Sequence, residues 1–384
     1  MEDVRGLLNR GNWHRLKKCM KKAKQGKKIM TSFLGGSITQ GSLSSSLELC
    51  YAYLVFEWWK KKFPQSEIKL INAGIGGTTS QFGAARVKEH LLKYNPDFIL
   101  IEFAVNDENS EFFEETYEGL IRKTYGDVCA PAILLMNNVR YDDGTNAEER
   151  HVKVARAYDL PMVSMKSAIW PDIESGRISG SSISPDGLHP NDRGHALVAG
   201  AVIAFLEKVF LEMDKEEAPA CFEAGALPVP ITANAYENAI RYQNDNFTPQ
   251  LNGFEADLSP QNGIADIFKK GWCAFREGDK VRFEVDGTEI AVQYRKSVHK
   301  PAPVAKAVVD GKEDDAVILD GNFEEDWGDC LYIDTVGRHM ETGKHTVELA
   351  IIKAHEDDAV PFYLVSVIVS GPCGLQQDAN FLLQ

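Results

Sequence analysis

The sequence has few cysteines, and none of them lies close to another in the sequence. Seven cysteines are scattered over 384 residues, and no Cys-x-x-Cys pair occurs. Zinc sites and the disulfide frameworks of small secreted domains both depend on closely spaced cysteines. The odd, scattered set therefore indicates reduced thiols, and we predict neither a structural metal nor a disulfide scaffold.

The chain also lacks an excess of basic residues. Lys and Arg number 42 against 56 Asp and Glu, which gives a formal net charge of −14. Nucleic acids and anionic membranes attract positive surfaces, so we expect neither as a partner. Residues 5–28 are a local exception, because basic residues alternate there with Leu, Trp and Met at helical spacing. Such a helix could touch a membrane, but we favour one that packs its apolar stripe on the domain.

Long hydrophobic runs are scarce as well. We find no window that approaches a membrane span, and Met1-Glu-Asp leads into no apolar core of the kind a secretory signal needs. We therefore expect a cytoplasmic protein. Apolar and charged residues make up 44% and 26% of the chain, as in globular proteins. A chain of 384 residues is too long for one ordinary core, so two domains are expected.

Nucleotide-binding signatures are missing too. Gly74-Ile-Gly-Gly77 follows a predicted strand but does not have the Gly-x-Gly-x-x-Gly spacing, and no Walker lysine is present. His345 and His355 stand among acidic residues without metal-ligand spacing. We therefore predict no cofactor.

Strand-like and helix-like stretches alternate from Ile29 to Glu212. Short apolar runs precede helical stretches, and proline or glycine ends several of them. The predicted strands are 29–34, 68–72, 98–105, 132–136 and 162–165. The predicted helices are 47–63, 80–94, 111–125, 147–158 and 190–212. The alternation predicts a parallel sheet covered on both faces, which is a three-layer α/β/α domain.

The pattern changes after residue 212. A charged, proline-punctuated stretch leads to short alternating runs joined by Asp-Gly pairs, the chemistry of hairpin turns. The predicted strands there are 280–285, 289–294, 305–309, 316–319, 346–352 and 362–369. We predict an α/β domain over 1–212 with an N-terminal helical extension at 1–28, a linker at 213–230, and an antiparallel β-sandwich or jelly roll over 231–384.

Ser37 stands where a predicted strand turns sharply through two glycines. The stretch Phe33-Leu-Gly-Gly-Ser37 would place a hydroxyl at the carboxyl edge of the sheet, where α/β folds hold their sites. An ordinary Gly-Ser turn has the same letters. A serine needs an adjacent base to act as a nucleophile, so the interpretation depends on other residues. No Gly-x-Ser-x-Gly elbow surrounds Ser37.

Three further stretches supply candidates for those other residues. Asn72-Ala-Gly-Ile-Gly-Gly-Thr78 follows the second strand and suits a backbone oxyanion donor, although a tight turn would look alike. Asn106-Asp107 follows the third strand, where Asn106 could donate to an oxyanion or cap a helix. Asp186-Gly-Leu-His189 lies in a Gly/Pro-rich loop, where an acid can orient a histidine.

The order and spacing of these blocks resemble the SGNH, or GDSL-type, hydrolases over about residues 28–212. The resemblance implies Ser37 as nucleophile, His189 as general base and Asp186 as the acid that orients it. It also implies an oxyanion hole made by the Ser37 amide, the Gly77 amide and the Asn106 side chain. Gly76 replaces Gly77 if the register shifts by one residue.

Two positions depart from the family pattern. Gly36 stands where an Asp often precedes the serine, and Ala104 stands where a Gly is frequent two residues before the Asn. Neither position carries the chemistry. The departures therefore concern the sub-family and the substrate rather than the activity.

SGNH hydrolases with an appended β-sandwich resemble carbohydrate esterases such as acetylxylan esterases. The resemblance implies a serine esterase that removes acetyl groups from acetylated xylan or xylo-oligosaccharide through an acyl-enzyme, and we also expect a homo-oligomer. One alternative is a broad short-chain or lipid esterase. Another is a carbohydrate-binding protein on an inactive hydrolase domain, although the complete set of motif residues argues against it.

Aromatic residues are candidates for sugar contacts, because sugars present apolar C–H faces to aromatic rings. Trp170 in the α/β domain and Trp272 and Trp327 in the β domain are the candidate substrate-binding residues. Core packing is the competing interpretation of each ring. The Gly/Ser-rich loop 175–189 and the lack of a long apolar insertion favour acetyl over longer acyl groups.

Overall fold

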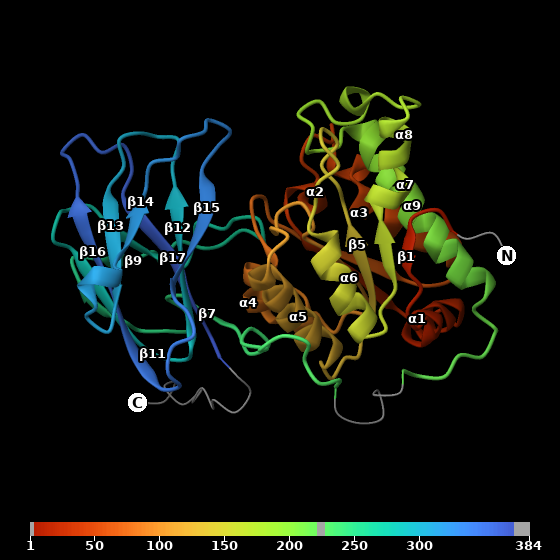
Figure 1. The fold of residues 1–384 in the computed structure, drawn as a ribbon, viewed down its shortest axis with the longest axis horizontal. Coiled ribbons are helices and arrows are strands. Elements are labelled where there is room, and N and C mark those ends of the chain that lie inside the picture. The colour runs from red at the N-terminus through yellow and green to blue at the C-terminus, as the bar shows by residue number, and fades with distance from the viewer. Residues whose placement is uncertain (1–3, 221–226, 372–384) are drawn as a thin grey trace. The chain divides into compact units, whose positions relative to one another are not determined.

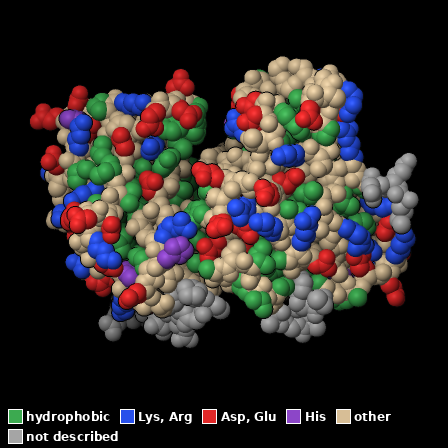
Figure 2. Space-filling view, in the orientation of Figure 1, with side chains coloured by type: hydrophobic (Ala, Val, Ile, Leu, Met, Phe, Trp, Pro, Cys, Tyr) green, Lys and Arg blue, Asp and Glu red, His purple; other side chains and the backbone are tan. Residues whose placement is uncertain are grey.

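The computed structural model of the chain describes residues 4–220 and 227–371 (Figure 1). It forms two compact units, Met1–Ala233 and Asn234–Gln384. Acidic and basic side chains are interspersed over the face shown in Figure 2.

A mostly parallel sheet organises the first unit. Its strands lie in the order β1-β6-β5-β4-β2-β3, and β2 to β6 pair in parallel while β1 pairs antiparallel with β6. Every residue of β4 is buried, as expected for a strand covered on both faces. The strands are β1 (Leu7–Asn9), β2 (Ile29–Gly35), β3 (Ile68–Gly74), β4 (Phe98–Glu102), β5 (Ala132–Asn137) and β6 (Met162–Ser164).

Helices cover both faces of this sheet, which confirms the predicted three-layer α/β/α domain (Figure 1). One layer contains α1 (His14–Lys24), α3 (Tyr51–Lys62) and α9 (Asp192–Leu211), and the other contains α4 (Ser80–His90), α5 (Glu111–Tyr125) and α6 (Glu148–Ala157). The short helices are α2 (Ser37–Gln40), η1 (Leu47–Leu49), η2 (Leu92–Tyr94), α7 (Met165–Ala168), α8 (Trp170–Glu174) and η3 (Gly180–Ser182).

The N-terminal region differs from the prediction. Leu7 lies in the edge strand β1 rather than in a helix, because its backbone pairs with Val163 of β6. The helix begins only at His14 and buries Leu16, Met20 and Ala23 in the main core. Packing of the apolar side chains on the domain is therefore confirmed, whereas the helix is confirmed only for 14–24 and is wrong for 5–13.

Helix α9 also corrects an expectation. It is long and apolar enough to cross a membrane by length and composition alone, with a mean hydropathy of 1.7, so the statement that no window approaches a span is wrong. Its apolar face is nevertheless used inside the unit, where Val202, Phe205 and Val209 are fully buried in the core. This is the arrangement of a core helix.

The chain direction of the strands determines where a site can form. From the central strand β2 the chain passes to β3 on one side and then to β4 on the other. The loops that leave the carboxyl ends of β2 and β4 therefore run in opposite directions, and a crevice opens between them. Ligands usually bind in this position in open α/β sheets. Ser37 follows β2 and Asn106 follows β4, so both lie at this crevice.

The second unit is a sandwich of two antiparallel sheets, as predicted. One has the order β15-β12-β17-β10-β9 with β7 also on β17, and the other has the order β14-β13-β16-β11-β8. Apolar side chains from both sheets, such as Phe283 and Leu364, form its core. The strands are β7 (Ile240–Tyr242), β8 (Gln250–Asn252), β9 (Glu255–Ala256), β10 (Trp272–Ala274), β11 (Lys280–Asp286), β12 (Glu289–Lys296), β13 (Val304–Val309), β14 (Val317–Asp320), β15 (Cys330–Gly337), β16 (Lys344–Lys353) and β17 (Phe362–Ser370), with the short η4 (Glu313–Asp315).

A buried carboxylate on α5 holds the end of the first unit. Glu118 accepts hydrogen bonds from the Ile231 amide at 2.8 Å and the Thr232 amide at 2.9 Å. One turn further, Arg122 donates to the Pro228 carbonyl at 2.7 Å. Residues 228–232 are thus anchored to α5 by charge-assisted hydrogen bonds.

Candidate active site

Ser37, His189 and Asp186 are joined by consecutive hydrogen bonds. Ser37 is the first residue of α2, directly after β2, and its Oγ lies 2.8 Å from His189 Nε2. The other ring nitrogen, Nδ1, lies 2.7 Å from Asp186 Oδ2. Both distances are within the range required for proton transfer. The structure therefore brings together three predicted residues although Ser37 and His189 are 152 positions apart.

The carboxylate of Asp186 is held in its charged form. Burial by itself raises the pKa of Asp186, but hydrogen bonds from the His189 side chain and from the His189 and Leu188 amides outweigh it, so the pKa lies below its ordinary value. Asp186 Oδ1 accepts the two amides at 2.7 and 2.9 Å, while Oδ2 faces the ring. A charged acceptor at Nδ1 favours the tautomer whose Nε2 can accept the serine proton.

Neighbouring loops fix the loop that carries the acid and base. The Gly187 carbonyl accepts the Tyr141 amide at 2.6 Å and the Asp142 amide at 3.2 Å, which ties the loop to the segment after β5. Asp192, just beyond the histidine, binds the Ser45 amide and hydroxyl, both at 2.7 Å. The segment after the nucleophile is therefore linked directly to the segment that carries its base.

The geometry distinguishes Gly77 from Gly76 as an oxyanion donor. The Gly76 amide donates to Gln40 Oε1 at 2.8 Å and is already used. Gly77 has a φ of +67° and is exposed, and within residues 4–220 and 227–371 its amide has no acceptor. Glycine is suited to this left-handed backbone. The arrangement favours Gly77, the first of the two alternatives.

Asn106 lies beside the nucleophile turn and caps none of the helices that the structure describes. A Cβ at Gly36 would be only 2.3 Å from Asn106 Oδ1, so the two residues are in close approach next to Ser37. The N-cap of α5 is Ser110, whose hydroxyl accepts the Phe113 amide, which contradicts the capping alternative for Asn106. Nδ2 of Asn106 has no acceptor in the part of the chain that the structure describes. Its N–H groups are therefore available to a ligand.

The close approach also explains one departure from the family pattern. Any side chain at position 36 would meet Asn106, so a glycine is required here by the position of the Asn106 side chain. The following residue, Asp107, fixes the same loop from below. It accepts the Ser80 amide at the start of α4 at 2.8 Å and contacts His151 Nε2 at 3.0 Å, both in the buried interior.

A second buried acid lies at the end of β4. Glu102 is fully buried and accepts the Ala104 amide at 3.0 Å. Burial raises the pKa of Glu102 to about 7, the Ala104 and Asn138 amides lower it in part, and the charge of Asp107 raises it further. The folded protein therefore holds a proton on this carboxyl at pH values where the unfolded chain, with its ordinary value of 4.5, has lost it.

This difference predicts a pH-dependent effect of Glu102→Gln. Between about pH 4.5 and pH 7 the folded state binds the extra proton, so wild-type stability falls as the pH rises through this window. Glutamine keeps the acceptor for the Ala104 amide but does not titrate. We therefore compare the free energy of unfolding of the variant with that of wild type. The difference, variant minus wild type, should increase by up to about 3 kcal/mol from pH 4.5 to pH 8.

Urea denaturation at pH 4.5 and pH 8 measures this change. Glu89→Gln, an exposed carboxyl of α4, is the matched control, and the effect of Glu102→Gln is measured against it at each pH. If Glu102→Gln and wild type differ in free energy of unfolding by the same amount at both pH values, the assignment of a raised pKa to Glu102 is wrong.

The three predicted aromatic residues have different positions. Trp272 is 1% exposed and packs in the core of the β unit against Phe283, so a sugar cannot reach it and the binding role predicted for it is wrong. Trp170 is half-buried, and its ring edge lies against Gly144, where a Cβ would be 2.5 Å away. Trp327 is 57% exposed, with its ring edge-on to Phe323.

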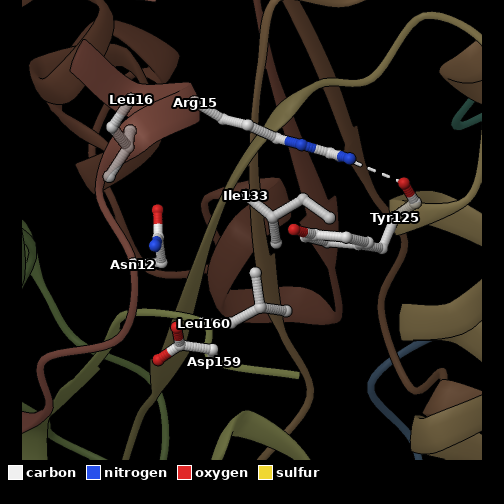
Figure 3. A pocket seen from close by; sticks show the side chains of 7 residues that line it. All are labelled: Asn12, Arg15, Leu16, Tyr125, Ile133, Asp159 and Leu160. Carbon is white, nitrogen blue, oxygen red and sulfur yellow. Dashed lines mark hydrogen bonds between the residues drawn. The ribbon is translucent and has the colours of Figure 1, made fainter. Parts of the chain in front are cut away.

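A small pocket lies at the end of the sheet opposite to Ser37. Arg15, Tyr125 and Leu160 are among the side chains that line it, near the amino ends of β5 and β6 (Figure 3). Arg15 donates to the Tyr125 carbonyl at 3.0 Å and lies over the Tyr125 ring. The pocket is thus part of the packing of α1 on the domain. Over the residues described, no group of three or more His, Cys, Asp or Glu side chains is arranged to hold a metal ion.

Several contacts around the site were not predicted. Gln40 occupies the Gly76 amide, Ser45 binds Asp192, and Glu102 supports the loop after β4. None of these residues stands out in the sequence, because a polar residue in a loop or at a strand end is expected to be exposed to solvent. The one signal that this acid would be buried is the continuous apolar run Phe98-Ile-Leu-Ile101 directly before it.

Comparisons with known proteins agree with this geometry. Residues 33–197 match the GDSL-like Lipase/Acylhydrolase family. A protein of Escherichia coli (strain K12) named thioesterase 1/protease 1/lysophospholipase L1 is 27% identical over 175 residues, which cover 43% of this chain and 77% of that protein.

Solved structures extend the similarity to both units. One solved structure is a two-domain esterase active on acetylated mannans, and its sequence is 54% identical to this chain. The alignment covers 95% of this chain and 97% of the esterase. The TM-score is 0.92, and it is 0.90 for the same type of esterase co-crystallised with mannopentaose. The chain is therefore related over its full length to this two-domain esterase, and its residues 33–197 form a GDSL-like lipase/acylhydrolase domain.

Proposed function

We propose that the protein is a serine esterase that removes acetyl groups from a carbohydrate, acetylated mannan or its oligosaccharides, through an acyl-enzyme on Ser37. The observation that carries the proposal is the hydrogen-bonded series Asp186–His189–Ser37. Beside it lie two N–H donors, at Gly77 and Asn106, that have no acceptor among the described residues. The series provides a base for the hydroxyl, and the donors provide a place for the negative charge that ester cleavage develops.

Acylation begins with attack by Ser37 Oγ on the ester carbonyl carbon. His189 Nε2 takes the hydroxyl proton as the C–O bond forms, and Asp186 stabilises the imidazolium that results. The carbonyl oxygen becomes an oxyanion that faces the Ser37 amide, the Gly77 amide and Asn106 Nδ2. When the tetrahedral intermediate collapses, the bond to the sugar oxygen breaks, and His189 returns the proton to that oxygen.

Deacylation reverses these roles with water as the attacking group. His189 takes a proton from water, and the hydroxide attacks the acetyl carbonyl on Ser37. The same three donors face the second oxyanion. Acetate leaves, Ser37 Oγ recovers its proton from His189, and the protein returns to its starting state without a cofactor.

The substrate proposal rests on the relative that covers the whole chain. The expectation from the sequence was acetylated xylan, but the 54% identical esterase is active on acetylated mannans, so we favour mannan. The exposed ring of Trp327 is the remaining aromatic candidate for a sugar contact in the β unit. Its indole N–H contacts Glu325 at 2.6 Å, which holds the ring in place.

A second candidate function has an observation of its own. Leu43, Leu47 and Leu49 follow the nucleophile helix and are 49%, 66% and 40% exposed. Apolar side chains there could contact a longer acyl chain, as in a lipid esterase, with a gain of about 0.8 kcal/mol per buried CH₂. The Escherichia coli relative carries the names thioesterase and lysophospholipase.

A substrate series separates the two functions. We expect the purified protein to release acetate from acetylated manno-oligosaccharides faster than from acetylated xylo-oligosaccharides. On p-nitrophenyl esters kcat/KM should fall from acetate to octanoate, and Ser37→Ala serves as the blank for every substrate. Rates that rise toward octanoate, with no acetate released from either oligosaccharide, would favour the lipid esterase and contradict the proposal.

A further inference from the structure

Arg86 is a fully buried arginine in α4, the helix that follows the Gly77 turn. Its Nη1 donates to the Ala73 carbonyl at 2.7 Å, and its Nη2 donates to the Gly35 carbonyl at 3.0 Å. One guanidinium group therefore bridges two neighbouring strands, β2 and β3. The proposed chemistry assigns no role to this side chain.

The two bridged carbonyls lie just below the candidate oxyanion donors. Gly35 ends β2 and is two residues before Ser37. Ala73 is the second-last residue of β3 and is three residues before Gly76. Gly35 and Gly74 are register partners, and the Ile75 amide also donates to the Gly35 carbonyl at 3.1 Å. The separation of the Ser37 and Gly77 amides depends on how these strand ends are held.

We propose that Arg86 is a positioning residue for the oxyanion hole: its planar fork sets the distance between the strand end that carries the Ser37 amide and the one that leads to the Gly77 amide. The inference rests on the proposed function. Donors in an oxyanion hole act through preorganisation, so a small shift between them lowers the rate without weakening substrate binding to the same extent.

The side chain suits this role better than a lysine would. A guanidinium presents several donors in a fixed plane, so it can hold two carbonyls at a set separation, whereas an ammonium is a point charge on a flexible stem. Packing also fixes the group, since the guanidinium carbon lies 5.1 Å from the centre of the Phe82 ring and Nη1 is 3.2 Å from His90 Nδ1. A buried cation next to the strand ends also favours negative charge above them.

Arg86→Lys tests the inference, with Arg122→Lys as the matched control. Arg122 is also a buried arginine that donates to a carbonyl, that of Pro228, but it lies on α5 and serves the anchored segment 228–232. Both variants should melt at lower temperature than wild type. On p-nitrophenyl acetate, well below both melting temperatures, Arg86→Lys should lower kcat by about 10- to 100-fold with KM changed less than threefold. Arg122→Lys should keep kcat within twofold.

A tetrahedral inhibitor gives a second readout. A small alkylboronic acid forms a tetrahedral adduct on an active serine, so its inhibition constant should rise in Arg86→Lys roughly in proportion to the loss in kcat. Asn106→Ala is the positive control, because it removes one donor outright. If Arg86→Lys does not fold, His90→Ala replaces it, and a lower kcat at unchanged KM is then the expected result.

The outcomes separate this inference from the proposed function. Suppose that wild type is active and that Arg86→Lys has the same kcat and boronate affinity as Arg122→Lys. The positioning role is then wrong and the esterase proposal stands, and the same holds for His90→Ala where it replaces Arg86→Lys. If wild type hydrolyses p-nitrophenyl acetate no faster than Ser37→Ala, the proposed function and this inference are both overturned.

Discussion

Replacing Ser37 by alanine should lower kcat on p-nitrophenyl acetate by roughly 10⁴- to 10⁶-fold while the protein remains folded. Alanine removes only the hydroxyl, whose contact is with His189 Nε2. The backbone turn through Gly35 and Gly36, which places residue 37, does not depend on that hydroxyl. The amides of the oxyanion hole also remain, so a small residual rate over water is expected.

Ser181→Ala is the matched control for this variant. Ser181 is an exposed serine in the loop before the acid and base, and its hydroxyl contacts only Ser179 among the residues described. We expect wild-type rates and an unchanged melting temperature. A Ser37→Ala protein whose turnover stays within tenfold of wild type would end the assignment of Ser37 as nucleophile.

The second large effect is expected for His189→Ala. It should be nearly as damaging as Ser37→Ala, and the double variant should be little worse than either, because the two side chains act as one unit. Asp186→Ala should cost less, since the acid orients the imidazole and stabilises its charge without reacting. Single-turnover and steady-state kinetics of the four variants on one substrate measure this pattern.

His355→Ala, an exposed histidine of the β unit, is the control for loss of an imidazole and should have no effect on kcat. If the losses in Ser37→Ala and His189→Ala multiply in the double variant, the two residues act independently. That result would contradict a shared proton-transfer mechanism.

Much of the fold could be predicted because local signals agreed with the tertiary structure. Helix α5 begins at Glu111 and ends at Tyr125 as expected, since Ser110 caps it and Gly126 follows its end. Short or irregular strands are among the failures. β1 has 3 residues and exists only by pairing with β6. β15 carries Asp334 in its interior and shows no clean alternation, so its apolar pattern did not indicate a strand.

The candidate site divides in the same way. Ser37, Asn106, Asp186 and His189 could be predicted because each follows a strand or precedes the last helix in a recognisable order. Arg86 could not, because an arginine inside a helical pattern predicts a solvent-facing position, whereas this one is 0% exposed. The binding role predicted for Trp272 was wrong because its side chain is buried. Trp272 lies in a 3-residue strand, which is too short for its sequence pattern to show which face of the sheet an aromatic residue occupies.

The central claim is that Ser37 carries the acyl group, and covalent labelling tests it most directly. The wild-type protein is treated with a serine-directed phosphonate, digested, and mapped by mass spectrometry, while acetate release from acetylated manno-oligosaccharide is followed in parallel. The account predicts one modification per chain, on Ser37, with loss of acetate release in proportion to labelling and protection by the oligosaccharide. Modification of another residue with Ser37 intact, or full acetate release from protein labelled at Ser37, would contradict it.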